Sequence, residues 1–180
     1  MNAFTIEKKF DLRKVRFDFS KQLNDFADAV VLDHKTRLQH GQGVDMKPMA
    51  KLKGSTIASK RFKRRKKPRV PLYGTGLMSK VYVKKRASKS QQRAIVIPPK
   101  KRKEIGKYHQ YGTSGPYPIR PKPPKTKLGP IFTDRGEMTF RKKVMHPGLK
   151  KREWFGITIK QEKVGLRLMS NEIERQLRRV

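Results

Sequence analysis

DFSKQLNDFADAVVLDHKTRLQH (residues 18–40) carries apolar side chains at spacings of three, four and seven residues. Those side chains are Phe19, Leu23, Phe26, Ala27, Val30, Val31 and Leu38. Because a helix repeats every 3.6 residues, this spacing predicts an amphipathic helix with one face against a core. Asp18 or Ser20 can accept hydrogen bonds from the first free amides of such a helix. Gly41 and Gly43 are suited to end it.

The segments on either side of this helix have weaker patterns. Residues 4–17 alternate only in part and predict either a strand or an arm. Residues 44–70 contain the turn formers Pro48 and Gly54 and show no sustained period. Their last part, KRFKRRKKPR (60–69), is almost entirely basic, and like charges four residues apart oppose a helix. We therefore expect 44–70 to be a long basic loop or arm.

Two hairpins are expected in the middle of the chain. Residues 77–83 and 93–97 are rich in β-branched and aromatic side chains and predict a hairpin over 76–98. Pro98 and Pro99 end its second strand, since proline cannot donate to a ladder. Strand signals return at 131–133 and 138–145, with a turn at 134–136 between them.

The remaining segments are helical or extended. Residues 104–112 predict a short helical turn closed by Gly112. Residues 113–130 are rich in proline and predict an extended arm rather than a packed element. A final helix is expected at 160–178, where apolar residues again fall on one face.

This order of elements predicts a single α+β domain over residues 1–180. We expect an antiparallel sheet of about four strands covered by the N- and C-terminal helices, with long basic and Pro-rich loops. The core should combine the apolar stripe of residues 18–40 with the first hairpin and the last helix. The expected core residues are Leu23, Phe26, Ala27, Val30, Val31, Val81, Val83, Ile95, Ile97, Ile173 and Leu177.

Charge is unevenly distributed along the chain. Residues 51–150 contain 30 Lys and Arg against three acids, whereas residues 1–50 contain nine against seven and residues 151–180 eight against four. A positive field of this strength implies a partner of opposite sign, either an acidic protein surface or nucleic acid. The residues expected to contact that partner are Lys60, Arg61, Lys63, Arg64, Arg65, Lys66, Lys67, Arg69, Lys100, Lys101, Arg102 and Lys103.

The composition argues against several kinds of site. Without cysteine, the chain has no disulfide, no thiolate zinc site and no cysteine nucleophile, which suits a protein assembled inside a cell. No apolar run reaches 18 residues, so we expect no membrane span. The first residues lack the apolar stretch of a signal peptide, and we expect them to belong to the mature protein.

Catalytic and metal-binding patterns are also missing. The four histidines, His34, His40, His109 and His146, have no paired acids at metal-ligand spacing. GTG at 74–76 is not followed by Gly-Lys-Ser/Thr and predicts a tight turn rather than a phosphate loop. We therefore expect no catalytic residues, no metal and no cofactor, and a protein that is not an enzyme.

Four short segments, read in order, resemble the phage virion morphogenesis family, the tail-completion and neck proteins of long-tailed phages such as Mu. They are MKPM (46–49) with Thr56 and Lys60, PLYGTGLM (71–78), KYHQYG (107–112) and REWFGI (152–157), followed by a terminal helix. Their order and spacing match over about residues 44–178. The positions that carry the resemblance are Pro71, Leu72, Thr75, Gly76, Tyr108, His109, Gln110, Gly112, Arg152, Trp154, Phe155 and Gly156.

The resemblance implies a virion structural protein that forms a ring at the junction between head and tail. Its partners would be further copies in a ring, a hexamer or dodecamer, together with neck, connector or tail-tube proteins and the genomic DNA in the lumen. Subunits of such a ring make side-to-side contacts that close by rotation. Extended arms, such as 60–69 and 113–130, are a usual means of adding contact area to a small core.

A second class stays open, a basic RNA-binding protein of ribosomal type. Such proteins are small and carry Lys- and Pro-rich extensions that become ordered against RNA phosphates. The aromatic residues Tyr73, Tyr108, Tyr111, Tyr117 and Trp154 lie among basic residues, as in proteins that stack on bases. We favour the alternative, in which the same aromatics anchor loops on the sheet or on a neighbouring subunit. Size separates the two classes, because a ring former is a hexamer-scale species and an RNA binder co-purifies with nucleic acid.

Overall fold

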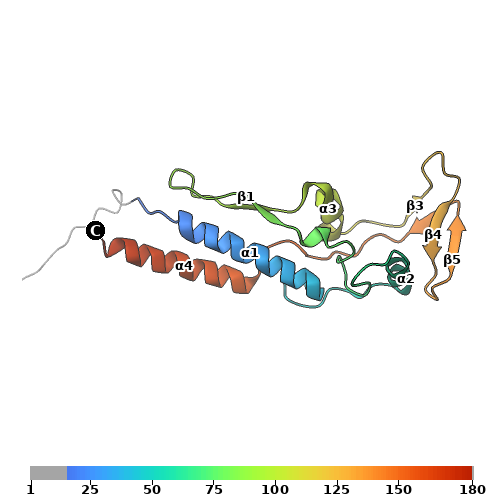
Figure 1. Ribbon diagram of the computed structural model, residues 1–180, viewed down its shortest axis with the longest axis horizontal. Helices are drawn as coiled ribbons and strands as arrows, with labels where there is room; N and C mark the ends of the chain where they lie inside the picture. The colour runs from blue at the N-terminus through green and yellow to red at the C-terminus, as the bar shows by residue number, and fades with distance from the viewer. Residues whose placement is uncertain (1–15, 180) are drawn as a thin grey trace, which may run out of the picture.

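The computed structural model describes residues 16–179, which form an elongated molecule (Figure 1). Its helices are α1 (Ser20–His40), α2 (Gly54–Phe62), α3 (Lys103–Tyr111) and α4 (Ile159–Leu177). Its strands are β1 (Tyr82–Lys85), β2 (Ile95–Ile97), β3 (Tyr117–Ile119), β4 (Leu128–Phe132), β5 (Met138–Arg141) and β6 (Val144–His146). Apart from its last two residues, the strand or arm expected at 4–17 lies outside the described part.

The strands form three separate antiparallel pairs within residues 16–179: β1 with β2, β3 with β6 and β4 with β5. The mixed α+β class is therefore confirmed, but the expected single sheet of about four strands is wrong. Each strand is only three to five residues long. Figure 1 shows the β1–β2 pair beside the long helices and the other two pairs at the opposite end. β1–β2 and β4–β5 are hairpins of consecutive strands, whereas β3 pairs with β6 across the intervening β4–β5 hairpin.

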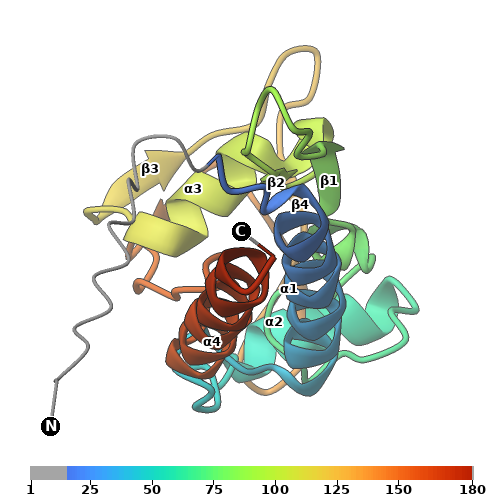
Figure 2. The same cartoon turned by 90° about the vertical axis from the view of Figure 1, so that its left-hand side faces the viewer.

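The two long helices lie side by side and antiparallel in both views (Figures 1 and 2), and they contact each other over part of their length. Gly165 of α4 allows this close approach, since a Cβ there would lie 3.1 Å from the Phe26 ring. Gly41 ends α1 in the left-handed conformation at φ 70°, which glycine adopts without strain. At the start of α4, Thr158 and Gln161 form a reciprocal capping box. Both predicted long helices are confirmed to within two residues at each end.

The buried core lies in the middle of the molecule rather than along the whole of α1. It contains Leu38, Met49, Met78, Val81 and Trp154. Val31, Leu72, Val96 and Phe155 pack against it and are partly buried. This small core joins the end of α1 to three loops that are distant in sequence.

The expected core list is only partly correct. Ala27, Val30 and Val81 are buried, as expected. Leu23, Phe26, Val31, Val83, Ile95, Ile97 and Leu177 are half-buried. Ile173 is exposed, so its assignment to the core is wrong. The side of α4 that meets α1 runs through Gly165 and Glu172 instead.

Two expected loops contain regular structure. Within 44–70, helix α2 occupies Gly54–Phe62 and ends as the dense basic run begins. Its first turn docks on the β4–β5 turn, where the Ser55 amide donates to Asp134 Oδ1 at 3.2 Å. Within 113–130, β3 and the start of β4 interrupt the expected extended arm. Both elements depend on partners more than ten residues away, which a local pattern cannot reveal.

Arg37 is a buried ionised residue that the sequence pattern did not single out. Its Nε donates to Asp33 Oδ2 at 2.6 Å, one turn earlier on α1. Its two terminal nitrogens donate to the carbonyl oxygens of Gly43 and Gly156. The guanidinium therefore ties the end of α1 to the segment that leads into α4. Replacing only one member of this buried network, such as Arg37 itself, should strongly destabilise the protein, because the buried groups that remain lose their partners.

Candidate functional site

Parts of the four segments that carry the family resemblance converge around Trp154, whereas Thr56 and Lys60 of the first segment lie on α2. Met49 from the first segment and Leu72 and Met78 from the second pack in the cluster that contains this indole. The third segment ends α3, whose Gly106 carbonyl accepts a hydrogen bond from Trp154 Nε1 at 2.9 Å. Side chains separated by more than 100 residues in sequence thus meet at one point in the fold.

Gln110 fastens the third segment to the fourth. Its Oε1 accepts from the backbone amides of Trp154 and Phe155 at 3.1 and 3.2 Å. Its Nε2 donates to the Phe155 carbonyl at 3.2 Å. The neighbouring His109 carbonyl accepts from the Arg152 amide at 2.7 Å. The side chain of Gln110 therefore acts as a structural clamp.

Other resemblance residues shape turns. Gly76 and Gly112 have φ values of 73° and 76°, where glycine is favoured, and a Cβ on Gly112 would lie 2.8 Å from the Leu149 carbonyl. Pro71 is buried against the end of α1, whereas Thr75 and Tyr108 are exposed. Gly156 lies where its carbonyl receives Arg37. Most of these residues serve packing and chain direction.

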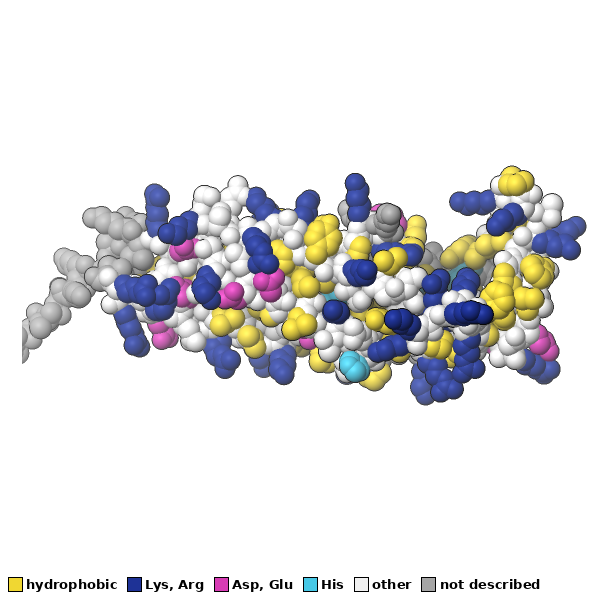
Figure 3. Space-filling model, in the orientation of Figure 1, with side chains coloured by type: hydrophobic (Ala, Val, Ile, Leu, Met, Phe, Trp, Pro, Cys, Tyr) yellow, Lys and Arg dark blue, Asp and Glu magenta, His cyan; other side chains and the backbone are white. Residues whose placement is uncertain are grey.

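Many basic residues gather at one end of the molecule, which lies opposite the start of α1 and the end of α4 (Figure 1). We call this the distal end and define it as residues 51–70 and 113–143. It contains eighteen Lys and Arg and only two acids. Figure 3 shows Lys and Arg crowded over this end, on the side of α2 and the β4–β5 pair. None of the ion pairs among the described residues involves one of these eighteen side chains.

Two of the predicted contact residues are held by the protein itself. Lys60 is half-buried, its Nζ donates to the Val70 carbonyl at 2.6 Å, and burial lowers its pKa. Lys67 donates to the Gln39 carbonyl at 3.2 Å and lies 5.4 Å from the Tyr73 ring centroid. Both tether the basic run to the core. Arg61, Lys63, Arg64, Lys66 and Arg69 are exposed, and Arg65 is half-buried.

A hollow of about 600 Å³ at the distal end combines cations with aromatic rings. Arg61 and Arg69 line it from one side and Arg135 from the β4–β5 turn. Phe62 and Phe132 form its apolar part, with ring centroids 5.4 Å apart. Guanidinium groups around an aromatic surface can bind phosphate or carboxylate groups. Sequence analysis missed Arg135, because only the fold brings the turn at 134–136 next to α2.

The second predicted basic run, residues 100–103, lies elsewhere. Lys100–Arg102 form a single 3-10 turn that leads into α3, in the middle of the molecule, and Lys103 is the first residue of that helix. Lys100 is exposed and Arg102 half-buried. Within the described residues, no hydrogen bond or ion pair joins this run to residues 60–69. The structure therefore does not bring the two predicted runs together as one site.

The histidines do not form a metal centre in the described residues, where no group of three or more His, Asp or Glu side chains is arranged to hold an ion. His34 is almost fully buried, and burial lowers its pKa to about 4. His109 is half-buried, and burial likewise lowers its pKa. Both are therefore neutral at pH 7. His146 stacks on Tyr117, with ring centroids 4.9 Å apart.

None of the helices in the described part is long and apolar enough to cross a membrane. Comparisons with known protein families, with curated proteins and with solved structures found no match.

Proposed function

We propose that this chain is a virion structural protein of a tailed phage, one subunit of a ring at the head–tail junction. In this role it acts without catalysis, metal or cofactor, and its partners are further copies of itself and neighbouring neck, connector or tail-tube proteins. The distal end supplies the surface that meets an acidic neighbour, with a minority of its charges facing genomic DNA.

The observation that carries the proposal is the convergence of the four resemblance segments on Trp154. Parts of these segments lie far apart in sequence and pack in one cluster. Here Met49, Leu72, Gln110 and Trp154 meet through one hydrophobic cluster and one hydrogen-bonded clamp. The resemblance therefore rests on a single packing unit of the fold, as expected for a structural protein.

The large accessible surface supports an assembled state. A monomer of 21.0 kDa exposes 14212 Å², whereas a compact protein of that mass exposes about 9,000 Å². The chain therefore exposes more surface than a compact protein of the same mass. Two standard interfaces remove about 800 Å² each from one subunit. Ring formation would bury part of this additional surface.

The unpaired charge at the distal end also fits a subunit. Eighteen cations without an ion pair among the described residues repel one another and destabilise an isolated chain. An acidic neighbouring ring would relieve that repulsion. Exposed cations such as Arg64 and Lys66 are available for this contact, because the protein does not use them internally.

The assembly state of the nuclease-treated full chain tests the proposal. We expect a closed ring of hexamer scale or larger, measured by light scattering after size exclusion and seen as rings by electron microscopy. Antibody labelling of purified particles should place the chain at the head–tail junction. A chain that stays monomeric at all concentrations and is absent from particles would overturn the proposal.

The competing function, an RNA-binding protein of ribosomal type, is favoured by one observation, the hollow that combines Arg61, Arg69 and Arg135 with two phenylalanine rings. Cations beside aromatic faces suit stacked bases and phosphates. This function predicts a purified chain that carries nucleic acid, releases it on nuclease treatment and then shows no self-association. The ring predicts self-association that survives the nuclease.

A further inference from the structure

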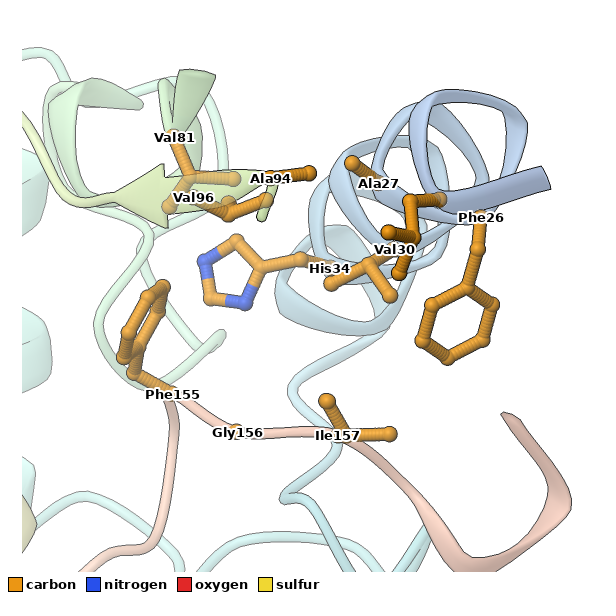
Figure 4. A pocket seen from close by; sticks show the side chains of 11 residues that line it. Phe26, Ala27, Val30, His34, Val81, Ala94, Val96, Phe155, Gly156 and Ile157 are labelled. Atoms are coloured by element: carbon orange, nitrogen blue, oxygen red, sulfur yellow. The ribbon is translucent and has the colours of Figure 1, made fainter. Parts of the chain in front are cut away.

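A groove of about 360 Å³ runs between α1, the β1–β2 hairpin and residues 155–157 (Figure 4). Ala27 and Val30 form its wall on α1, and Ala94 and Val96 form the wall on the hairpin. Apart from one histidine, its lining consists of apolar side chains and glycine. Its volume falls within the range of about 300–1,000 Å³ typical of pockets that hold a ligand or an anchoring side chain. The function proposed above assigns no role to this groove.

His34 provides a single polar atom inside the groove. The residue is 1% exposed, and its Nε2 lies 3.3 Å from the Met78 carbonyl. A carbonyl oxygen only accepts, so Nε2 carries the proton and Nδ1 presents a lone pair. Nδ1 is buried and has no hydrogen-bond partner. Figure 4 shows it facing the space between α1 and residues 155–157. An occupant that brings a donor to this atom removes the cost of leaving it unpaired.

Helix α3 exposes a face with matching chemistry. Ile105, Tyr108 and Tyr111 follow one another at spacings of three and are 41%, 52% and 76% exposed. Gly106 and Gln110, on the opposite side of α3, contact Trp154 and hold this face outward. Each tyrosine combines a large apolar ring with a hydroxyl donor, the combination that an apolar groove with one acceptor requires.

We propose that the groove binds the Ile105–Tyr111 face of α3 from a second copy of this chain, with a tyrosine hydroxyl donating to His34 Nδ1. The inference rests on the proposed function and names the contact between ring neighbours. The accessible surface exceeds that of a compact protein of the same mass, which leaves room for one such interface on each side of a subunit. A different exposed apolar stripe, formed by Ile159, Leu166 and Ile173 on α4, offers no donor for the histidine.

The groove and the α3 face share no residue, and in the proposed ring their contact is heterologous: each subunit offers one of each to two different neighbours. Such contacts continue until rotation closes them into a ring. A tyrosine seated in a desolvated apolar pocket is the kind of anchor that dominates interface energies.

Association of full-length, nuclease-treated variants tests the contact. In a face variant, Tyr108→Ser and Tyr111→Ser are combined, which removes both anchors from exposed positions. In a groove variant, Ile157→Glu places a charge at the groove edge, at a residue that is 52% exposed. Because both sites are on the surface, both proteins should fold. We expect each alone to weaken self-association by on the order of tenfold or more in sedimentation equilibrium.

Mixing the two variants gives a sharper result. The face variant keeps an intact groove and the groove variant keeps an intact α3 face, so the pair can form one contact and no ring. We expect a 1:1 mixture to form heterodimers and nothing larger. Tyr82→Ser, a tyrosine of similar exposure at 46% on β1, is the matched control and should assemble like the wild type.

The hydroxyl and the groove each have their own measurement. Tyr111→Phe and Tyr108→Phe, tested separately, keep the apolar ring, and the one that bonds His34 should weaken association about fivefold, as loss of one hydrogen bond does. Trp154 is the only tryptophan and its ring centroid lies 5.4 Å from that of His34. Its emission should therefore shift as wild type and Tyr82→Ser assemble.

The outcomes separate this contact from the proposed function. A wild type that stays monomeric without nucleic acid overturns both. A wild type that assembles, with face and groove variants that assemble equally well, overturns the contact and leaves the ring standing. A mixture of folded variants that forms no heterodimer also overturns the contact.

Discussion

Gly106 and Trp154 are in such close contact that no larger residue fits at position 106. A Cβ built on Gly106 would lie 2.5 Å from Trp154 Cζ2, and the indole Nε1 donates to the Gly106 carbonyl at 2.9 Å. Trp154 is 2% exposed and has little room to move. The contact fixes α3 against the segment that leads into α4, and through it the four resemblance segments share one core.

Gly106→Ala should therefore destabilise the protein although alanine favours a helix. Overpacking of a buried site costs about 1–3 kcal/mol, against a helix gain of about 1 kcal/mol. We expect a net loss of up to about 2 kcal/mol in urea unfolding followed by Trp154 fluorescence. Gly74→Ala is the control, since no atom lies within 4 Å of its added Cβ. Equal stability of the two variants would contradict the packing described here.

Gln110→Ala should leave three backbone groups of Trp154 and Phe155 without their partner. Part-buried groups that lose a hydrogen bond cost about 1–3 kcal/mol, and we expect a loss of this size in the free energy of unfolding. Lys107→Ala, at an exposed position of the same helix, should change it by less than about 0.5 kcal/mol. The clamp is disproved if the two variants unfold at the same urea concentration.

Stability should fall as the pH drops from 6.5 towards 4. Burial lowers the pKa of His34 from 6.5 to about 4. Between these pH values His34 binds a proton in the unfolded chain but not in the folded protein, which favours unfolding. At 1.36 kcal/mol for each pKa unit, the loss reaches about 3 kcal/mol. The lowered pKa of His109, also caused by burial, acts in the same direction.

Unfolding measured between pH 7 and 5 isolates the histidines. The Arg175 hydrogen bond lowers the pKa of Glu172 to about 2, and that stabilisation is lost only below about pH 4.5. His34→Gln should flatten the pH dependence, because glutamine can still donate to the Met78 carbonyl but does not titrate. An unchanged slope in this variant would show that His34 titrates normally.

Charge reversal of Arg64, Arg65 and Lys66 together should block the joining of heads to tails and leave the subunit folded. These side chains form no ion pair among the described residues, and two of them are exposed. The matched control reverses Lys84, Lys89 and Arg93 on the first hairpin, with the same change in charge. The measurement is in vitro joining of purified heads and tails. Normal joining by the first triple variant would exclude a role for this run.

Amide hydrogen exchange should separate the basic run from the core. In the free subunit we expect fast exchange over 63–69 and 120–127, which contain no helix or strand and cannot bury enough apolar surface alone. Slow exchange is expected for α1 near Leu38. Assembled particles should protect both segments. Strong protection in the free subunit would mean that they are ordered without a partner.

Sequence periodicity predicted the elements whose formation depends least on residues distant in sequence. The long helices α1 and α4 follow from apolar spacing, and β1–β2 and β4–β5 from short β-rich runs around a turn. Gly41 ends α1 as expected, since a left-handed residue is a local requirement. The helix α2 was not predicted, because the dense basic run around its end argued against a helix. Its first turn is also held by Asp134, which is distant in sequence.

Local sequence patterns did not predict which side chains are buried or brought together where this depends on segments distant in the sequence. Ile173 lies on an apolar stripe of α4, yet that helix turns Gly165 and Glu172 towards α1 and leaves Ile173 exposed. From the sequence, Arg37 is expected at the surface. In the fold it is buried and donates hydrogen bonds to the carbonyl oxygens of Gly43 and Gly156. Arg135 joins Arg61 and Arg69 only because β4 and β5 lie beside α2.

The sequence by itself determined the element types, the concentration of charge in residues 51–150 and the absence of cysteine chemistry, because these depend on composition and on neighbours within one or two turns. Only the tertiary structure decided that the resemblance segments meet at Trp154, that the strands form separate pairs and that His34 faces an apolar groove. The hydrogen bonds of Trp154 to Gly106 and of His34 to Met78 join residues more than forty positions apart. Their free energy comes from burial and hydrogen bonds that exist only once the chain has folded.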